Sequence, residues 1–565
     1  MQNSKIVVIG GSAAGAKAAA KARRLDQQAE ITIVQKDPDL SMASCGYPYY
    51  IGGTFDERNQ LLATPTGVVR NPDFFYKTKR INALVNTECT AIDRNEKKVT
   101  CRNLESGEET TLSYHKLVVA TGASAAVLPV PGRELEGVST LVSMQDTDRI
   151  HDLCASGTVT EAVVIGGGLI GVETCEALVA KGVKVTLVEM EKQVLTFLDA
   201  QFAGLVANHM KAKSVSVRLG MRLERCLGED GRLTGVELAN GEVLPCQLAV
   251  VAAGVRPNIG LAEAAGLEIG ESRAIAVNEY MQTSDADIYA AGDCVECVNS
   301  VTGKKVYAPM GDLANLQGRV LGENLIEGNV VKFGGTQQTA ICKVFDFVAG
   351  ATGLSEKAAI AAGLTDFETV VNASPDKPGF MGAKLLVSKI LVEKSSQKIL
   401  GYQCVGSGDV SRQIATAAMA IKGRLTLDDL NCADLPYAPP FSLAIDHFIA
   451  SAHIISNKLK GRIKTVTAEE VYKRVQEGNP PFFIDGRGPD EHEVLRLGIG
   501  EKYIPLGMLR NVLGELPQEK DTEIVCFCKI SLRGYETALI LEANGYTNVK
   551  VMEGGIMAWP YSREK

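Results

Sequence analysis

Short apolar runs followed by glycine-rich turns recur along the chain and predict parallel α/β units. Ile6–Ile9 is followed by a glycine-rich turn, an expected helix over Ala16–Leu25 and a second apolar run, Ile31–Val34. Ala162–Gly171 repeats this beginning, and Val183–Val188 supplies its next strand. The order of buried strand, glycine turn and helix is typical of a Rossmann fold. The sequence therefore predicts two Rossmann-like nucleotide-binding domains.

The two glycine turns carry the residues expected to approach a dinucleotide. These are Gly10, Gly11, Ser12, Ala13, Ala14 and Gly15 in the first unit, and Gly166, Gly168 and Gly171 in the second. Glu189 ends the next strand of the second unit. It can bind both ribose hydroxyls and would repel a 2'-phosphate, which favours NADH over NADPH. Gln35 takes the equivalent place in the first unit and can accept one hydrogen bond.

Three further segments indicate how the two units are connected. Leu117–Gly122 is an expected strand with a small-residue turn, and Ile288–Asp293 is an expected strand that ends in an aspartate. The turn Ala252–Asn258 returns the chain from the second unit to the first. The second nucleotide-binding domain is therefore expected to be an insertion in the first.

The pattern changes after about residue 331. Strands are expected over Lys384–Val392 and Ile399–Val405, and helices over Gly408–Lys422 and Ser442–Ser456, which together predict an α+β domain. A loop braced by three prolines, 434–442, displays Tyr437, whose hydroxyl can protonate a leaving thiolate. A tyrosine that only packs against the prolines is the alternative.

A separate α/β module is expected beyond a short basic connector. Its strand from Ile524 ends at Cys528, and a helix is expected over Gly534–Asn544. The amides of 529–533 can curl around one sulfur and, with Arg533, stabilise a persulfide anion on Cys528. The alternative is a strand cysteine that caps a helix. Cys526 shares the face of Cys528 and is either a packing residue or a resolving thiol.

Composition and charge restrict the class of protein. The 565 residues predict three to four domains, and the net charge of -8 argues against general binding of nucleic acid or membrane surfaces. The start of the chain leaves no room for a signal peptide, and no apolar run reaches the length of a membrane span, so we expect a cytoplasmic protein. The 14 cysteines lack framework spacing and are expected to be reduced. The lone Cys294–Cys297 pair predicts no metal site.

Cys45 is the strongest candidate for a redox nucleophile. It lies in Ser41–Gly53, after the second strand of the first Rossmann unit. Gly46 and Pro48 are expected to form a tight turn after it, in a polar, partly exposed pocket that lowers the pKa of the thiol. A buried structural cysteine is the alternative.

Taken together, these motifs resemble those of the coenzyme A disulfide reductases fused to a rhodanese domain, including the NADH-dependent persulfide reductases of that group. The resemblance rests on both glycine loops, the Cys45 segment, Gly292–Asp293, Tyr437, and Cys528–Gly534 with Gly554–Gly555 and Trp559. It implies FAD and NADH as cofactors, coenzyme A as substrate or ligand, and a small-molecule sulfur substrate. It also implies a homodimer in which Tyr437 reaches the partner's Cys45.

The resemblance assigns further site residues and the domain organisation. Cofactor contacts are also expected from Lys36, Thr121, Gly122, Gly254, Gly292 and Asp293, and a coenzyme A site from Lys21, Arg24, Ser41, Ser44 and Lys79. The expected parts are an FAD-binding domain (1–115 and 250–330), an NAD-binding domain with connecting strands (116–249), a dimerisation domain (331–457), a linker (458–467) and a rhodanese domain (468–565).

Three positions differ from the pattern of these enzymes. Gln35 stands in place of a glutamate and Ser44 in place of an asparagine, while Phe380 lies in a segment that often carries a second tyrosine. Two other functions stay open. One is an NADH oxidase or peroxidase in which Cys45 cycles through a sulfenic acid. The other is a flavoprotein that senses redox state through Cys45.

Overall fold

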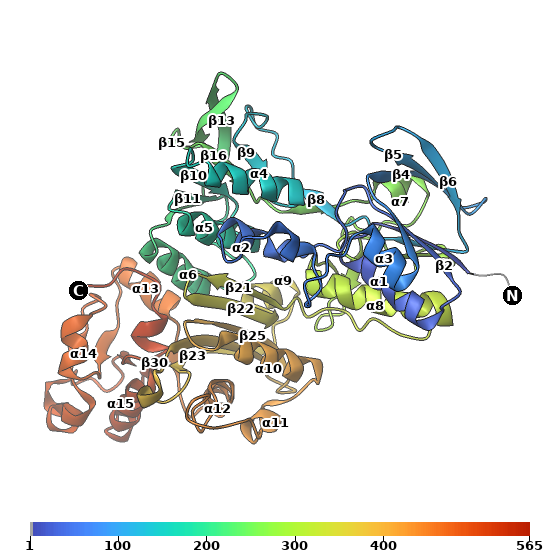
Figure 1. Cartoon of the computed structure of the whole chain (residues 1–565). Coiled ribbons are helices and arrows are strands. Elements are labelled where there is room, and N and C mark those ends of the chain that lie inside the picture. The colour runs from blue at the N-terminus through green and yellow to red at the C-terminus, as the bar shows by residue number, and fades with distance from the viewer. Residues whose placement is uncertain (1–3, 565) are drawn as a thin grey trace. The chain divides into compact units, whose positions relative to one another are not determined.

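The computed structural model describes residues 4–564 and separates into two compact units. The first comprises residues 4–190 and 221–336, and the second comprises 191–220 and 337–564. Figure 1 shows helices and sheets alternating in both units, which confirms the predicted α/β class. Within residues 4–564, no helix combines the length and apolarity of a membrane span.

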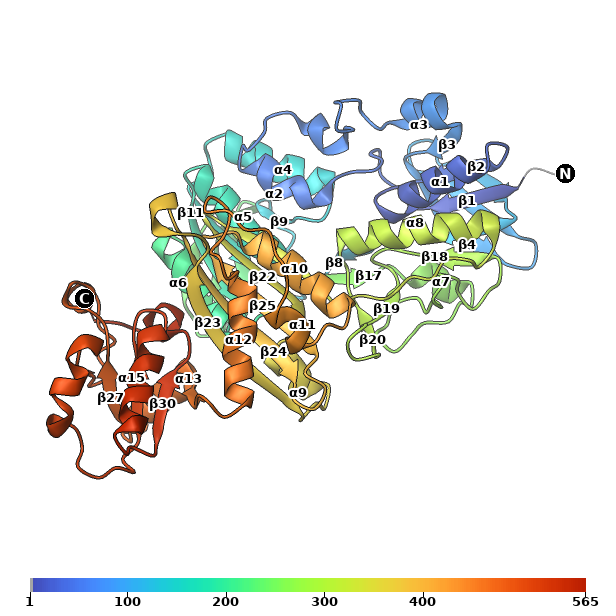
Figure 2. The ribbon, with the colours of Figure 1, turned by 90° about the horizontal axis from the view of Figure 1, so that it is seen from below.

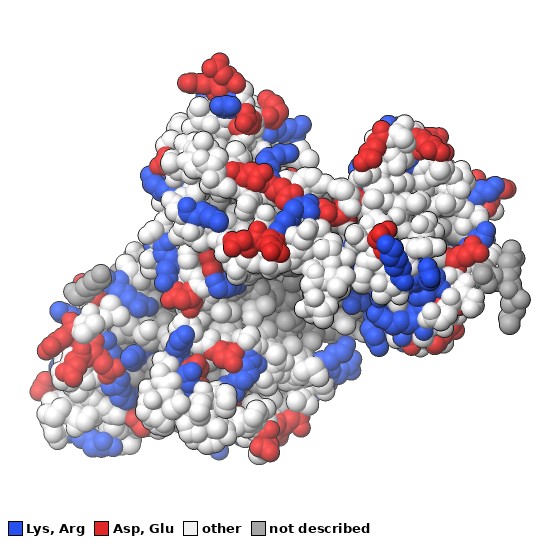
Figure 3. All heavy atoms as spheres, viewed as in Figure 1, with Lys and Arg blue, Asp and Glu red and all other residues white. Residues whose placement is uncertain are grey.

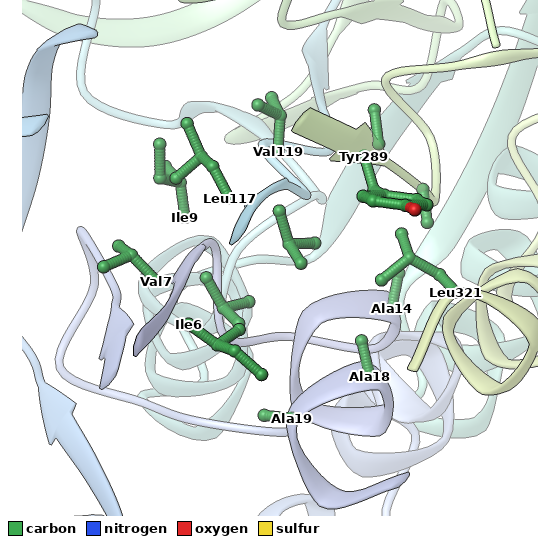
Figure 4. Packing of buried hydrophobic residues seen from close by; sticks show 14 of the residues in the cluster. Ile6, Val7, Ile9, Ala14, Ala18, Ala19, Leu117, Val119, Tyr289 and Leu321 are labelled. Atoms are coloured by element: carbon green, nitrogen blue, oxygen red, sulfur yellow. The ribbon is translucent and has the colours of Figure 1, made fainter. Parts of the chain in front are cut away.

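The first sheet is parallel and has the strand order β18-β7-β1-β2-β3. Its strands are β1 (Lys5–Ile9), β2 (Glu30–Val34), β3 (Ile81–Leu84), β7 (Lys116–Val119) and β18 (Ile288–Ala290). Figure 4 shows side chains from β1, β7 and β18 meeting those of two helices in one core. Because β7 lies in this sheet, the first nucleotide-binding domain continues past residue 116, where the sequence placed the next domain.

Helices α1 (Ala14–Leu25) and α8 (Gly311–Glu327) pack side by side on this unit (Figures 1 and 2). Glycines on α8 allow the close approach. A Cβ on Gly318 would lie 2.4 Å from the carbonyl oxygen of Ala14, and one on Gly322 would lie 2.6 Å from that of Ala18. The contact fixes the beginning of α8 near the nucleotide loop.

A second parallel sheet in the first unit contains β11 (Lys184–Glu189), β10 (Glu161–Ile165), β16 (Leu248–Val251) and β9 (Val138–Thr140), in that order. Helix α5 (Leu169–Ala180) follows β10. The chain leaves the first nucleotide-binding domain through β8 (Ala123–Ala125) and returns to it through β17 (Val255–Pro257). These two short strands form an antiparallel pair. The predicted insertion of one nucleotide-binding domain into the other follows from this pairing.

The second unit contains an antiparallel sheet with the order β21-β22-β25-β24-β23. The strands are β21 (Ala340–Val344), β22 (Phe347–Gly353), β23 (Phe367–Pro375), β24 (Leu385–Glu393) and β25 (Ile399–Gly406). Helices α10 (Val410–Lys422) and α12 (His447–Leu459) cover it. The expected helix from Ser442 begins five residues later, because the Asp446 side chain caps α12 by accepting from Phe448 N–H (2.9 Å).

Helix α6 (Ala200–Ala212) follows β11 in sequence but packs on the antiparallel sheet of the second unit. Its N-cap residue Asp199 accepts from Gln403 Nε2 at 2.7 Å and pairs with the buried Lys389 at 3.1 Å. These long-range bonds explain why residues 191–220 belong to the second unit.

The C-terminal module is a parallel sheet with the order β26-β30-β29-β27-β28. The strands are β26 (Thr465–Val466), β27 (Phe482–Asp485), β28 (Lys502–Tyr503), β29 (Ile524–Phe527) and β30 (Val549–Met552), with helices α13 (Ala468–Gln476), α14 (Pro489–Val494) and α15 (Leu532–Ala543). Since α12 ends at Leu459 and β26 begins at Thr465, the connection is shorter than the expected linker 458–467.

His447 is buried between α12 and the antiparallel sheet and makes the second unit sensitive to acid. Its ring nitrogens contact Ser374 Oγ (2.5 Å) and Ser388 Oγ (2.7 Å). Burial lowers the pKa of His447 to about 4, with Asp446 opposing and Arg412 reinforcing the shift. The unfolded chain therefore binds more protons between about pH 4 and 6.5, so the free energy of unfolding falls as the pH is lowered through this range.

We predict that His447→Gln removes roughly 2 to 3 kcal/mol of the stability difference between pH 7.5 and pH 4.5. Denaturant unfolding of both proteins at the two pH values measures it, because the double difference cancels the other titrating groups. Equal pH dependence in the native chain and the variant would contradict a neutral, buried His447.

Candidate active sites

The first glycine loop has the geometry that a bound pyrophosphate requires. Gly10 has a φ of +101°, and a Cβ there would lie 2.0 Å from the carbonyl oxygen of Ala120. A Cβ on Gly15 would lie 1.9 Å from the carbonyl oxygen of Gly10. Gln35 Oε1 accepts from Gly11 N–H at 2.6 Å, and the expected contact of Gln35 with the cofactor stays a prediction. The loop therefore tolerates no side chain at Gly10 or Gly15.

The second loop repeats this arrangement at the beginning of α5. A Cβ on Gly166 would lie 2.3 Å from the carbonyl oxygen of Ala252, and one on Gly171 would lie 1.9 Å from that of Gly166. Glu189 Oε2 accepts from Gly167 N–H at 2.5 Å. In contrast, a Cβ on Gly168 would meet no atom within 4 Å, so the backbone at the N-terminus of α5 is open to a ligand.

Cys45 lies in a 3₁₀ turn, Ser44–Gly46, that leads directly into α2 (Tyr47–Ile51). Pro48 occupies the first turn of α2, so the expected tight turn is instead the beginning of a helix. The Cys45 side chain is exposed and lies close to the start of α8, since a Cβ on Gly311 would be 3.5 Å from Cys45 Sγ. The thiol therefore faces the N-terminus of a 17-residue helix.

The sequence predicts a lowered pKa for the Cys45 thiol, and this prediction is wrong: the protein groups around the thiol raise its pKa. Partial loss of water around the sulfur raises the pKa of Cys45, and the carboxylates of Glu173, Asp293 and Asp312 raise it further. None of these three influences on Cys45 was predicted: Asp293 was expected only as a cofactor contact, and Glu173 and Asp312 come from α5 and from α8. The hydroxyls of Ser41 and Ser44, which are close to Cys45 in sequence, do not offset the effect of these carboxylates on its pKa.

Asp293 and two glycine turns provide a test of whether FAD fits this unit. The Asp293 carboxylate has no hydrogen-bond partner in the described part of the chain, and burial raises its pKa to about 6. A Cβ on Gly122 or Gly254 would meet no atom within 4 Å, and both residues have positive φ. A partly buried carboxylate without a partner, beside open backbone, fits the ribitol hydroxyls and phosphates of FAD.

Asn258 is a site residue that the sequence analysis did not single out. Its Nδ2 donates to Thr121 O at 2.8 Å, and Thr121 Oγ1 donates to Asn258 O at 2.7 Å. These bonds join the turn after β7 to the turn after β17. The position of Asn258 at the end of the returning segment was the only available signal.

The expected coenzyme A residues lie on and beside α1 and α3 (Pro72–Lys79). Figure 3 shows blue spheres gathered over the region that Figure 1 labels α1 and α3. Burial lowers the pKa of Lys79, and the nearby cations Arg24 and Lys17 lower it further, so these three groups form one basic cluster. Lys21 is instead paired with Glu323 at 2.8 Å. Lys36, an expected cofactor contact, pairs with Glu88 at 2.8 Å.

In the second unit, Cys528 is fully buried where β29 meets the loop before α15. Arg533 Nη1 and Nη2 donate to Glu491 at 2.6 and 2.9 Å. This pairing and the Cys528 sulfur together raise the pKa of Arg533. Glu491 was missed because it lies 42 residues from Arg533. The structure thus brings Cys528 and Arg533 together and holds the guanidinium in place.

Two other cysteines near these sites are packing residues. Cys526 is fully buried in the module's apolar core, and burial raises its pKa, so it is not placed as a resolving thiol. Cys294 is also buried and donates to the carbonyl oxygen of Ala291 at 3.4 Å.

Tyr437 is exposed in its proline-braced loop, and Phe380 is 80% exposed in a 3₁₀ turn, Gly379–Met381, between β23 and β24. Asp446, which caps α12, also accepts from Ser442 Oγ (3.3 Å) and pairs with Arg412 (2.9 Å) at the end of this loop. Tyr437 and Cys45 belong to different units of the chain, and their approach stays a prediction.

Two nucleotide loops around an exposed cysteine, followed by an antiparallel α+β domain and a cysteine-loop module, define a flavin-dependent disulfide reductase joined to a sulfurtransferase module. The chain belongs to the pyridine nucleotide-disulphide oxidoreductases: residues 4–310 match that family, 339–448 match its dimerisation domain and 467–561 match rhodanese-like domains. Members of the family use FAD and a pyridine nucleotide. The resemblance and the predicted fold class are confirmed.

Three proteins that are similar to this chain carry different functional names. The structure of an NAD-dependent persulfide reductase from A. fulgidus is 42% identical, covers 98% of this chain and 100% of its own, and has a TM-score of 0.93. An NAD(P)H coenzyme A polysulfide/persulfide reductase of Pyrococcus horikoshii is 34% identical over 80% of this chain and 98% of its own length. An NADH oxidase of Methanocaldococcus jannaschii is 31% identical over 81% of this chain and 100% of its own length.

Proposed function

We propose that this protein is an NADH-dependent reductase of persulfides, polysulfides or coenzyme A disulfide, coupled to a sulfurtransferase. The observation that carries the proposal is the combination of a single exposed cysteine on the nucleotide-binding unit with a buried, arginine-flanked cysteine on a rhodanese module. Of the fourteen thiols, only Cys45 and Cys432 are exposed. No second thiol on Ser41–Gly53 can form an internal disulfide with Cys45.

The reaction at Cys45 follows from thiol–disulfide exchange. The Cys45 thiolate attacks the inner sulfur of a persulfide, RSSH, forming a mixed disulfide with RS and releasing hydrosulfide. The first glycine loop and Asp293 would hold FAD, which would supply two electrons that originate in NADH. Two electrons and a proton then return the mixed disulfide to the Cys45 thiolate and a free thiol. The backbone amides at the N-terminus of α8 favour an anionic Cys45 sulfur, whereas Asp312 in the first turn of the same helix disfavours it.

Coenzyme A is the proposed thiol carrier. The basic cluster of Lys17, Arg24 and Lys79 matches the phosphates of coenzyme A, while Ser41 and Ser44 flank Cys45 in sequence. The Pyrococcus horikoshii relative is named an NAD(P)H coenzyme A polysulfide/persulfide reductase. We also propose a cytoplasmic homodimer, because a dimerisation domain is present and all fourteen cysteines are free thiols.

Steady-state NADH oxidation with a panel of acceptors tests this function. The panel contains coenzyme A persulfide, coenzyme A disulfide, polysulfide, oxygen and peroxide. We expect kcat/KM to be highest for a sulfur acceptor. The oxidase relative makes oxygen the main rival, and faster turnover with oxygen or peroxide than with every sulfur compound would overturn the proposal.

Nucleotide choice is expected to follow from Glu189. The side chain is almost completely buried at the end of β11, so a 2'-phosphate placed beside it would bring two negative groups together. We predict that kcat/KM for NADH exceeds that for NADPH by about 10-fold or more, equivalent to about 1.4 kcal/mol. Equal values in stopped-flow reduction of the enzyme would contradict this role.

Tyr437 is proposed to act as a general acid near the partner's Cys45. Tyr437→Phe should slow sulfur reduction by roughly 100-fold without slowing reduction of bound FAD by NADH, because only the proton donor is lost. Mixing Cys45→Ser subunits with Tyr437→Phe subunits restores one complete site per heterodimer if the residues act in trans. A mixture with verified subunit exchange and no gain in activity would exclude the shared site.

A further inference from the structure

A five-residue segment after β30 lies directly against the loop that carries Cys528. Ile556 N–H donates to Cys528 O at 3.0 Å, and Met557 N–H donates to Lys529 O at 3.1 Å. From the loop side, Ser531 Oγ donates to Met552 O at 2.7 Å. The position of the Cys528 loop therefore depends on where residues 553–557 are held.

Glu553, the first residue of this segment, is fixed to the dimerisation domain through a buried carboxylate. The residue is 2% exposed. Its Oε2 accepts from the backbone N–H of Val371 at 2.8 Å, and its Oε1 accepts from Lys458 Nζ at 3.0 Å and from Thr465 Oγ1 at 2.6 Å. Val371 lies on β23, the edge strand of the antiparallel sheet. The carboxylate thus satisfies an outward N–H group that an edge strand would otherwise leave unpaired.

Two glycines allow this segment to lie close to both domains at once. Gly554 has a φ of +69°, and a Cβ there would lie 2.9 Å from Val371 Cγ1. Gly555 has a φ of +57°, and a Cβ there would lie 2.3 Å from the carbonyl oxygen of Cys528. The path from β23 to the Cys528 loop therefore runs through Glu553, Gly554 and Gly555, with no intervening layer of side chains.

Helix α6 contacts the residues that follow this segment. Gln201 Nε2 donates to Ala558 O at 2.7 Å, and Asn208 Nδ2 donates to Pro560 O at 2.6 Å. A Cβ on Gly204 would lie 2.9 Å from the ring of Pro560. Residues 553–560 are consequently held from two sides within the second unit, by β23 and by α6.

We propose that Glu553 is a positioning residue for sulfur transfer at Cys528, and that the dimerisation domain holds the sulfurtransferase loop in its active shape. The inference rests on the proposed function of Cys528. When Glu553 loses its charge, Lys458 loses a buried partner and the segment 553–557 is released from β23. The backbone of the loop that carries Cys528 then loses the support of the hydrogen bonds from Ile556 and Met557.

The test compares Glu553→Gln with Glu523→Gln, a matched control in the same module. Glu523 also pairs with two cations, Arg474 (2.7 Å) and Lys550 (2.8 Å), but among residues 4–564 no hydrogen bond or ion pair joins its side chain to the Cys528 loop. Sulfur transfer from thiosulfate to cyanide gives kcat and KM, and hydrogen exchange reports on residues 528–533 and on α13. We expect about a 10-fold lower kcat and at least several-fold faster exchange over 528–533 in Glu553→Gln alone, with α13 and the KM for thiosulfate unchanged.

A milder variant keeps the test decisive if Glu553→Gln folds poorly. Thr465→Val removes one hydrogen bond to Glu553 with little change in shape, and should shift exchange over 528–533 in the same direction by a smaller factor. Exchange equal to the Glu523→Gln control, or faster exchange throughout the module including α13, would overturn the positioning role. Absence of sulfur transfer in the unaltered chain would instead refute the proposed function of Cys528, while the exchange rates would still decide the role of Glu553.

Discussion

Replacement of Cys45 by serine should lower NADH-driven reduction of persulfide or polysulfide by about 1000-fold or more, because the nucleophile that forms the mixed disulfide is lost. Reduction of bound FAD by NADH should stay within a factor of about two, since the residues proposed to hold the two cofactors are the glycine loops and Asp293 and do not include the thiol. Stopped-flow spectroscopy measures flavin reduction, and steady-state NADH oxidation measures the overall reaction.

The matched control is Cys432→Ser, which removes the other exposed thiol. We expect this variant to retain full activity. Persulfide turnover by Cys45→Ser at the native rate would show that another group forms the bond to sulfur. Loss of flavin reduction in the same variant would place Cys45 in cofactor binding.

Replacement of Cys528 by serine should have a comparably large effect on a different reaction. Sulfur transfer from thiosulfate to cyanide should fall by about 1000-fold or more, because Cys528, which lies beside Arg533, is the proposed carrier of the transferred sulfur. NADH-driven reduction of small acceptors at Cys45 should continue. Assaying both reactions on one preparation separates the two sites.

Cys526→Ser is the control for this experiment, because Cys526 lies on the same strand but is buried in the apolar core. It should retain sulfur transfer, apart from any loss of stability that burial of a hydroxyl causes. Simultaneous loss of both activities in folded Cys528→Ser protein would contradict two separable sites. Full activity in Cys528→Ser would contradict the assignment of the sulfur carrier.

The sequence predicted best those features that depend on a few consecutive residues. Strand β1 and helix α1 begin within two residues of the expected positions, and Gly10 and Gly166 have the positive φ that their turns require. Periodicity and turn chemistry therefore located the nucleotide loops.

Features that depend on distant residues were not predictable in this way. The pKa of Cys45 is raised with the help of Glu173 and Asp312, which approach it only after folding. The same holds for Glu491 beside Arg533 and for the packing of α6 on the antiparallel sheet. Burial and long-range pairing decide these properties, and neither is encoded in a local pattern.

The residues of α6 that contact residues 558–560 should differ between relatives with and without the C-terminal module. A relative whose whole length matches only about four-fifths of this chain, such as the Methanocaldococcus jannaschii protein, has no room for the C-terminal module. In such proteins nothing requires a glycine at the position of Gly204, or the amides of Gln201 and Asn208. These three positions should therefore change together with the gain or loss of the module, and an alignment could use them to date the gene fusion.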